Sequence, residues 1–177
     1  GTVNFINPND NDSQISAGAS TEPLTISSLE TSADGVMVFD FNFEDMASGD
    51  ALATIIDQIS ITQGDANEIS DWTNAIAGAK LFGPDLSSGL SGTINPTNIT
   101  FSGTDFISVD DGTSETYQLY IWLKTDLSNI SDNDILEFKI DNNNIITDYA
   151  GSSFGSSSAE SGNANNSISI LATNLSF

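Results

Sequence analysis

The densest group of potential metal ligands is the turn at residues 45–50, where Asp45 and Asp50 flank Gly49. Calcium takes six to eight oxygen ligands, which carboxylates and backbone carbonyls of neighbouring loops supply together. One turn cannot fill that coordination, so the prediction also needs oxygens from the preceding strand and from a second loop. The alternative interpretation is that these carboxylates are turn and capping residues in a very acidic protein. The predicted Ca²⁺ ligands are Glu44, Asp45, Asp50, Asp71 and Asp148.

A second oxygen-rich run, NPNDND at residues 7–12, is similar to the alternating ligands of calcium loops. It lacks the downstream glycine and glutamate spacing that an EF-hand requires. Asparagine, aspartate and proline also favour turns in solvated chain, so a linker explains the run equally well.

Two aromatic side chains, Tyr120 and Trp122, fall on the polar side of an alternating segment. Aromatic rings on an exposed sheet face can stack on sugar rings through their apolar surfaces. The competing interpretation places them beneath a loop or in a second core, which is the commoner fate of tryptophan. Tyr120 and Trp122 are therefore candidate contacts to a surface polysaccharide or another glycan.

The charge of the chain excludes several classes of protein. There are 25 acidic residues against three lysines, a formal net charge of -22, and no arginine, histidine or cysteine. Nucleic-acid binding needs clustered basic residues, and an anionic membrane surface would repel this chain. Without histidine or cysteine, a Ser-His-Asp triad, a thiol nucleophile and the common zinc sites are unavailable. No run of about 18 apolar residues is present, so no membrane insertion is expected.

Paired carboxylates could also serve as the two catalytic groups of a glycosidase. Among 25 acidic residues, however, chance pairs are inevitable, and the surroundings single out none of them. Arginine and histidine, which often orient the sugar in such clefts, are absent. We therefore expect a protein that is not an enzyme.

Alternating apolar residues predict short β-strands along most of the chain. Phe39, Phe41 and Phe43 share one face of the segment 36–45, which is the period of a half-buried strand. Further strands are expected at residues 24–26, 52–62, 93–95, 97–101, 104–109, 115–125, 135–141 and 167–171.

Within residues 115–125, alternate residues from Tyr117 to Leu123 are predicted to face the core. Within residues 52–62, Ile55, Ile59 and Ile61 are predicted to share a face.

The segment 70–79 has a different period. Its apolar residues recur at i, i+3, i+4 and i+7, which predicts one or two turns of helix. Asp71 is the expected N-cap and Gly78 the expected terminator of this helix.

Many short strands, frequent turn signals and a single helical turn indicate an all-β protein built as an antiparallel β-sandwich. An immunoglobulin-like and a jelly-roll arrangement fit these signals equally well. Residues 22–177 are predicted to form the sandwich module, and residues 1–21 an N-terminal linker or edge strand.

Five sequence phrases, in their order and spacing, resemble a repeat module of very large secreted surface proteins of gliding and marine bacteria. The gliding-motility adhesins are the best-known members of that group. The phrases are EPLTISSL at 22–29, LATIIDQI at 52–59, DWTNAIAGA at 71–79, YIWLKT at 120–125 and GSSFG at 151–155.

The resemblance spans residues 22–177 and implies a β-sandwich strung in tandem on the bacterial cell surface, as part of an adhesin or its stalk. It implies neighbouring modules of the same chain as partners, and it brings no catalytic motif. In such modules the turn that corresponds to residues 45–50 is similarly acidic, which fits a module stiffened by calcium.

Overall fold

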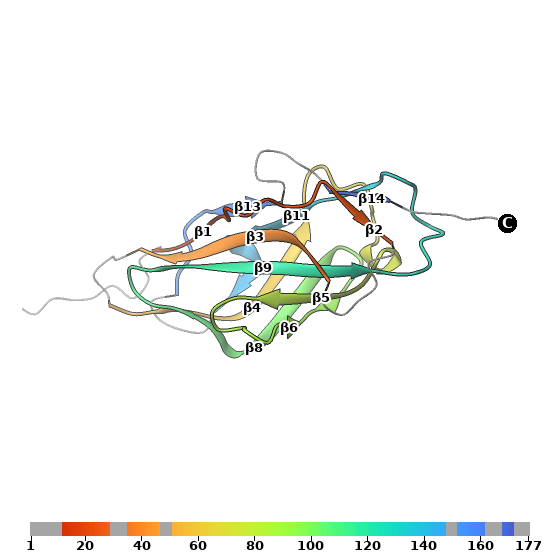
Figure 1. Cartoon of the computed structure of the whole chain (residues 1–177). Helices are drawn as coiled ribbons and strands as arrows, with labels where there is room; N and C mark the ends of the chain where they lie inside the picture. Colours follow the sequence, from red (N-terminus) through yellow and green to blue (C-terminus); the bar gives the residue numbers. More distant parts are fainter. Residues whose placement is uncertain (1–11, 29–34, 47–50, 148–151, 162–167, 172–177) are drawn as a thin grey trace, which may run out of the picture.

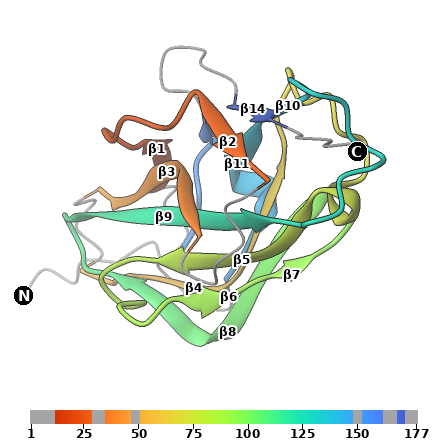
Figure 2. The same cartoon turned by 45° about the vertical axis from the view of Figure 1, so that its right-hand side comes forward.

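The computed structural model describes residues 12–28, 35–46, 51–147, 152–161 and 168–171. Strands dominate these ranges, and the helical segments described are two 3-10 turns of three residues each. Two large sheets form two layers, and a small third sheet lies beside them (Figures 1 and 2). The predicted all-β sandwich with a short helical turn is therefore confirmed as a fold class.

The first large sheet has the strand order β1-β3-β9-β5-β6, and its neighbouring strands are antiparallel. Alternation along β3 buries Phe39, Phe41 and Phe43 completely, as their spacing predicts. Opposite them on β9, Tyr117 and Leu119 are buried as well, so β3 and β9 form the centre of the sheet's inner face. The strands are β1 (Ser13–Ala17), β3 (Val36–Asp45), β5 (Ile76–Phe82), β6 (Leu90–Ser91) and β9 (Ser114–Leu123).

The second large sheet has the order β13-β11-β4-β8-β7, with the short β12 also paired to β4. Its pairs are antiparallel too. The two strands predicted at 97–101 and 104–109 belong to one strand, β8, which pairs with β4 on both sides of a register shift at residues 103–106. The strands are β4 (Thr54–Gln63), β7 (Thr93–Ile94), β8 (Asn98–Val109), β11 (Phe138–Asp141), β12 (Ile145–Ile146) and β13 (Ser158–Glu160).

The small third sheet has the order β10-β14-β2. Its pair β2 and β14 runs parallel, an exception to the antiparallel pairing of the large sheets. The two strands lie far apart in the sequence, and no local pattern signals their pairing. The strands are β2 (Thr25–Ser27), β10 (Ile135–Leu136) and β14 (Ile168–Leu171).

The helix predicted over residues 70–79 is wrong beyond its first turn. The 3-10 turn η1 spans Trp72–Asn74, and strand β5 already begins at Ile76. A register shift between Ile76 and Gly78 lets Ile76 and Ala79 both face the core from a strand. A β-bulge therefore produces the three-residue apolar spacing that a helix would also produce.

A second bulge changes the predicted face of β4. The register with β8 shifts between Ile56 and Gln58, and Ile56 instead of Ile55 faces the core. The prediction that Ile55 shares a face with Ile59 and Ile61 is therefore wrong.

The core between the two large sheets runs along the length of the sandwich. At one end the ring centroid of Phe43 lies 5.5 Å from that of Tyr117, and at the other Trp72 packs against Phe138 at 5.0 Å. Strand β1 lies toward the first of these ends and β14 toward the second (Figure 1).

Candidate functional site

Asp45, the last residue of β3, is buried at one end of the first sheet, with 2 % of its surface exposed. Thr54 Oγ1 donates a hydrogen bond to Asp45 Oδ2 at 2.8 Å, and Ser13 Oγ lies 2.6 Å from Thr54 Oγ1. This chain of side chains joins β1 and β3 of one sheet to β4 of the other. The second carboxylate oxygen, Asp45 Oδ1, is buried and has no hydrogen-bond partner.

Two further carboxylates approach Asp45. The backbone of Asp12 accepts a hydrogen bond from Met46 N at 3.0 Å, which holds the buried Asp12 beside the end of β3. Asp111 lies in the β8–β9 turn, which is held against β3 because Asp45 N donates to Thr113 O at 2.9 Å. Asp111 Oδ1 is also buried without a hydrogen-bond partner. We call Asp12, Asp45 and Asp111 the acidic end cluster.

The electrostatics of the acidic end cluster disfavour its full ionisation. Burial raises the pKa of Asp45, the hydrogen bond from Thr54 lowers it, and the charges of Asp12 and Asp111 raise it again. Burial wins because a carboxylate removed from water loses solvation that one hydroxyl donor does not replace. A bound cation or a proton would relieve this repulsion.

The acidic end cluster is not a preformed metal cage. Within the described ranges, no three acidic side chains are arranged to hold an ion by themselves. Calcium tolerates irregular coordination and accepts hydroxyl, carbonyl and water oxygens beside carboxylates. The oxygen atoms present, from carboxylates, Thr54 Oγ1 and backbone carbonyls, are of the types that calcium binds. These side chains would have to move closer together to coordinate one ion.

The other predicted ligands do not join Asp45. Glu44 points to the opposite face of β3, where it accepts a hydrogen bond from Ser16 Oγ. Asp71 lies at the far end of β9, roughly 30 Å away by strand rise, because Ala75 O accepts from Lys124 N there. Its Oδ1 caps η1 by accepting from Thr73 N at 2.9 Å. A single ion held by Asp45, Glu44 and Asp71 is therefore wrong for geometric reasons. Asp50 and Asp148 lie outside the described residues.

Tyr120 and Trp122 occupy the outer face of the first sheet, as the alternation of β9 predicts, and both are half-buried. The ring of Tyr120 meets that of Phe82 on β5 edge to face, with centroids 5.0 Å apart. Trp122 lies against Gly78, because a Cβ added at position 78 would be only 2.0 Å from its Cζ2. A pocket of about 310 Å³ borders this indole.

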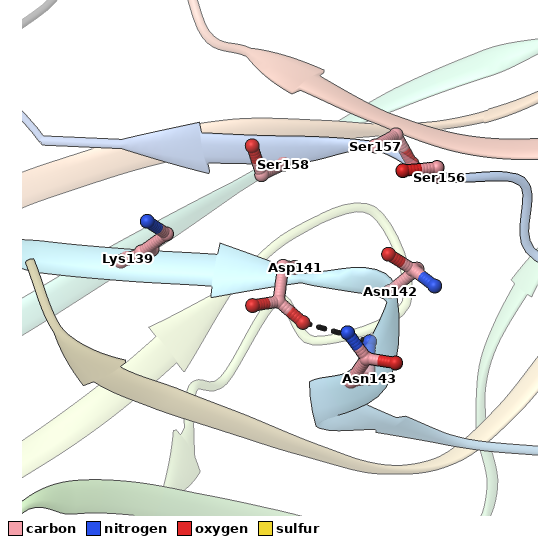
Figure 3. Close-up of a pocket in the computed structure, with 7 residues that line it drawn as sticks. All are labelled: Lys139, Asp141, Asn142, Asn143, Ser156, Ser157 and Ser158. Carbon is pink, nitrogen blue, oxygen red and sulfur yellow. Dashed lines mark hydrogen bonds between the residues drawn. The ribbon is translucent and has the colours of Figure 1, made fainter.

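A polar pocket of about 320 Å³ lies on the second sheet, where β11 leads into the 3-10 turn η2 (Asn142–Asn144) (Figure 3). Asp141 Oδ1 accepts a hydrogen bond from Asn143 N at 2.8 Å, so this carboxylate caps η2. Ser157 Oγ accepts from Ile15 N at 2.9 Å. These groups already stabilise the fold, and the pocket offers hydrogen bonds to solvent or ligand without an activated serine nucleophile. The lining residues are Lys139, Asp141, Asn142, Asn143, Ser156, Ser157 and Ser158.

Sequence reasoning alone does not assign Asp12 or Asp111 to the end that Asp45 occupies. Asp12 is the last residue of the linker-like run at residues 7–12, and the sequence around Asp111 predicts a turn. That turn is confirmed, since Thr113 N donates to Asp110 O at 3.0 Å and Gly112 adopts a φ of 72°. No local sequence signal places this turn there; the pairing of β3 with β9 brings the turn before β9 beside the end of β3.

Comparison with known proteins adds little to this geometry. No protein-family model matches the chain, and no curated protein matches it. One solved structure with a similar course of the chain is described as "AvmM Catalyzes Macrocyclization in Alchivemycin A Biosynthesis". It is 8% identical, has a TM-score of 0.43, and the match covers 94% of this chain and 93% of that one. A likeness at this level carries no argument about activity. In the described part of the chain, no helix is long and apolar enough to cross a membrane.

Proposed function

We propose that this chain is a non-enzymatic module of a large bacterial cell-surface adhesin, secreted to the surface, where it has a structural or adhesive role and is stiffened by calcium. The observation that carries the calcium proposal is the acidic end cluster, in which Asp45 and Asp111 each keep a buried oxygen without a hydrogen bond. Buried like charges are costly unless a cation or a proton compensates them. In the described ranges, ion pairs are formed by Lys139, on the second sheet, and none reaches the cluster.

The direction of the chain supports a role as one unit in a tandem array. Strand β1 lies toward the end of the sandwich that carries the acidic end cluster, and β14 lies toward the opposite end (Figure 1). First and last described strands at opposite ends of a sandwich suit modules joined head to tail, as the resemblance to gliding-motility adhesins implies. A cation at the acidic end cluster would then stiffen the junction with the preceding module.

The side-chain types available and their engagement in the fold support a non-enzymatic role. The sequence contains no histidine, cysteine or arginine, and the carboxylate of the polar pocket on β11 is engaged in capping. Asp12 and Asp45 of the acidic end cluster are buried, and Asp45 accepts a hydrogen bond from Thr54, so neither carboxylate faces an open cleft.

Calorimetric titration with CaCl₂ tests the calcium proposal directly. We expect binding by the wild type and at least a tenfold weaker affinity for Asp45→Asn, because one buried anionic ligand is lost. Asp110→Asn is the matched control, since it removes the same charge from an exposed residue that directly precedes Asp111. No heat of binding in the wild type, or equal loss in both variants, would show that the acidic end cluster holds no calcium.

Labelling of intact, unpermeabilised cells with an antibody against this module tests the proposed location. Surface labelling that disappears after brief external proteolysis is the expected result. Labelling that appears only after permeabilisation would contradict the adhesin proposal and leave the calcium measurement unaffected.

A second candidate function is carbohydrate binding, which the outer aromatic face of the first sheet favours. Tyr120, Trp122 and Phe82 present rings on that face, and rings on a sheet surface are suitable platforms for sugars. Quenching or a shift of tryptophan fluorescence by soluble glycans tests it, with Trp122→Phe to identify the responding residue, because Trp72 is fully buried.

A further inference from the structure

The three lysines of this chain are distributed unevenly with respect to its acidic residues. Lys139 on the second sheet is compensated, with its Nζ 2.8 Å from Glu160 Oε1 and 3.7 Å from Asp65 Oδ1. Lys80 and Lys124 form no ion pair with the residues that the structure describes. Among the described residues, Lys80 and Lys124 are therefore the two lysines outside an ion pair, in a chain with a formal net charge of -22.

Both of these lysines flank the outer aromatic face. Lys80 on β5 is the register partner of Tyr120 on β9. Lys124 directly follows β9, in phase with Trp122, and lines the pocket beside its indole. The carboxylate that lines this pocket together with Lys124 is Asp126, whose pKa is lowered by its hydrogen bonds with Ser128 and by Lys124. Asp126 is exposed and already accepts a hydrogen bond from Ser128 N at 3.0 Å, so its attraction for Lys124 is weak. The anion of a bound ligand can therefore take its place beside Lys124.

The aromatic rings on this face are held in fixed positions. Gly78 lets the indole of Trp122 lie directly on the backbone of β5, so that its remaining surface borders the pocket. Phe82 is held in the same way over Gly89, where a Cβ would be 2.6 Å from its Cζ, and Phe82 in turn contacts Tyr120. Rings that are immobilised before binding lose little conformational entropy when a ligand stacks on them.

We propose that the outer face formed by Lys80, Phe82, Tyr120, Trp122 and Lys124 binds an acidic polysaccharide, a polymer of uronate-type sugars. Sugar rings stack on Trp122 and Tyr120, and their carboxylates pair with the ammonium groups of Lys80 and Lys124. This inference rests on the carbohydrate-binding function proposed above and specifies the class of ligand.

Charge complementarity selects an acidic over a neutral glycan. Elsewhere the acidic excess of the surface repels polyanions, so the positive charges concentrated beside the stacking rings favour a ligand that carries its own anions. The repulsion from distant carboxylates is screened beyond about 8 Å at physiological ionic strength, whereas the direct lysine contacts are retained. The aromatic rings supply the contact with the apolar face of each sugar, which charge alone would not provide.

The test is calorimetric titration with sodium salts of galacturonate and mannuronate hexasaccharides, beside a neutral galactose hexasaccharide, in chelator at about 0.15 M ionic strength. We expect a uronate to bind and the neutral hexasaccharide to bind at least fivefold more weakly. Lys80→Gln and Lys124→Gln should each weaken uronate binding about threefold, the range of an exposed ion pair. Trp122→Ala and Tyr120→Leu should each weaken it about tenfold, with the thermal midpoint measured to confirm that the variants fold.

Lys139→Gln is the matched control, because it removes the same charge from the other sheet and should leave uronate affinity unchanged. Equal binding of neutral and acidic hexasaccharides, or an equal loss in the Lys80, Lys124 and Lys139 variants, would overturn the acidic specificity and leave carbohydrate binding in place. No binding of any hexasaccharide would overturn both. The chelator keeps either result independent of the calcium proposal.

Discussion

Replacing Asp45 by asparagine should raise stability without calcium and reduce the stability that calcium adds. Without calcium, the substitution removes a buried charge that Asp12 and Asp111 repel, and its amide nitrogen can donate to those carboxylates. The amide oxygen can still accept from Thr54 Oγ1. Relief of a buried unsatisfied group is worth about 1–3 kcal/mol. For a protein of this size that corresponds to a rise of about 2–10 °C in the thermal midpoint.

With calcium this advantage shrinks. An ion that binds only the folded wild type stabilises it by about 2.7 kcal/mol at a hundred times its dissociation constant. This adds about 8 °C to the wild-type midpoint, while a variant with tenfold weaker affinity gains about 1.4 kcal/mol, or about 4 °C. The assay is thermal unfolding followed by circular dichroism in excess chelator and in CaCl₂, with Asp110→Asn as the exposed control.

The dependence on pH provides a second readout in chelator. Because the pKa of Asp45 in the folded protein is raised above 3.8, the folded state binds more protons between that value and the raised one. The contribution of Asp45 to stability therefore falls as pH rises through this window, and the full penalty persists at neutral pH. The advantage of Asp45→Asn over the wild type should be greatest at neutral pH and vanish below 3.8. A variant that is less stable than the wild type in chelator at neutral pH would refute this reasoning.

Three further substitutions test other parts of the structure. Thr54→Val should lower the free energy of unfolding, measured by chemical denaturation, by about 1–3 kcal/mol, because Asp45 loses its hydroxyl donor. The control Thr93→Val, at an exposed position on an edge strand, should have little effect. Tyr117→Phe should reduce the loss of stability at alkaline pH. Burial raises the pKa of the Tyr117 phenol above 10.0, so the folded wild type loses stability as pH rises past that value. Equal loss of stability at alkaline pH in the wild type and in Tyr117→Phe would contradict this. Gly78→Ala should displace the Trp122 indole, which shifts its fluorescence to the red and weakens uronate binding. An unchanged emission spectrum would show that the ring does not rest on β5.

The period of the side chains determined much of this fold from the sequence alone. Alternation in 36–45 and 115–125 is a local property of an extended chain, so it correctly assigned Phe39 and Tyr117 to the core and Trp122 to the outer face. The same reasoning failed at Ile55, where the register of β4 with β8 shifts, and at residues 75–79, where a β-bulge inserts one residue and imitates the spacing of a helix. Bulges arise from pairing with a partner strand, which the local sequence does not specify.

The candidate sites were decided mostly by tertiary structure. The sequence identified Asp45 as an acidic strand end, but only the pairing of β3 with β1 and β9 brings Asp12 and Asp111 to it. That same pairing separates Asp45 from Asp71 by the length of β9. Likewise, Tyr120 and Trp122 are visible as outward residues, whereas their contacts with Phe82 and Gly78 depend on the register of β5 with β9. Side-chain periodicity is encoded in neighbouring residues, while the grouping of charges and rings depends on which distant strands pair and in which register.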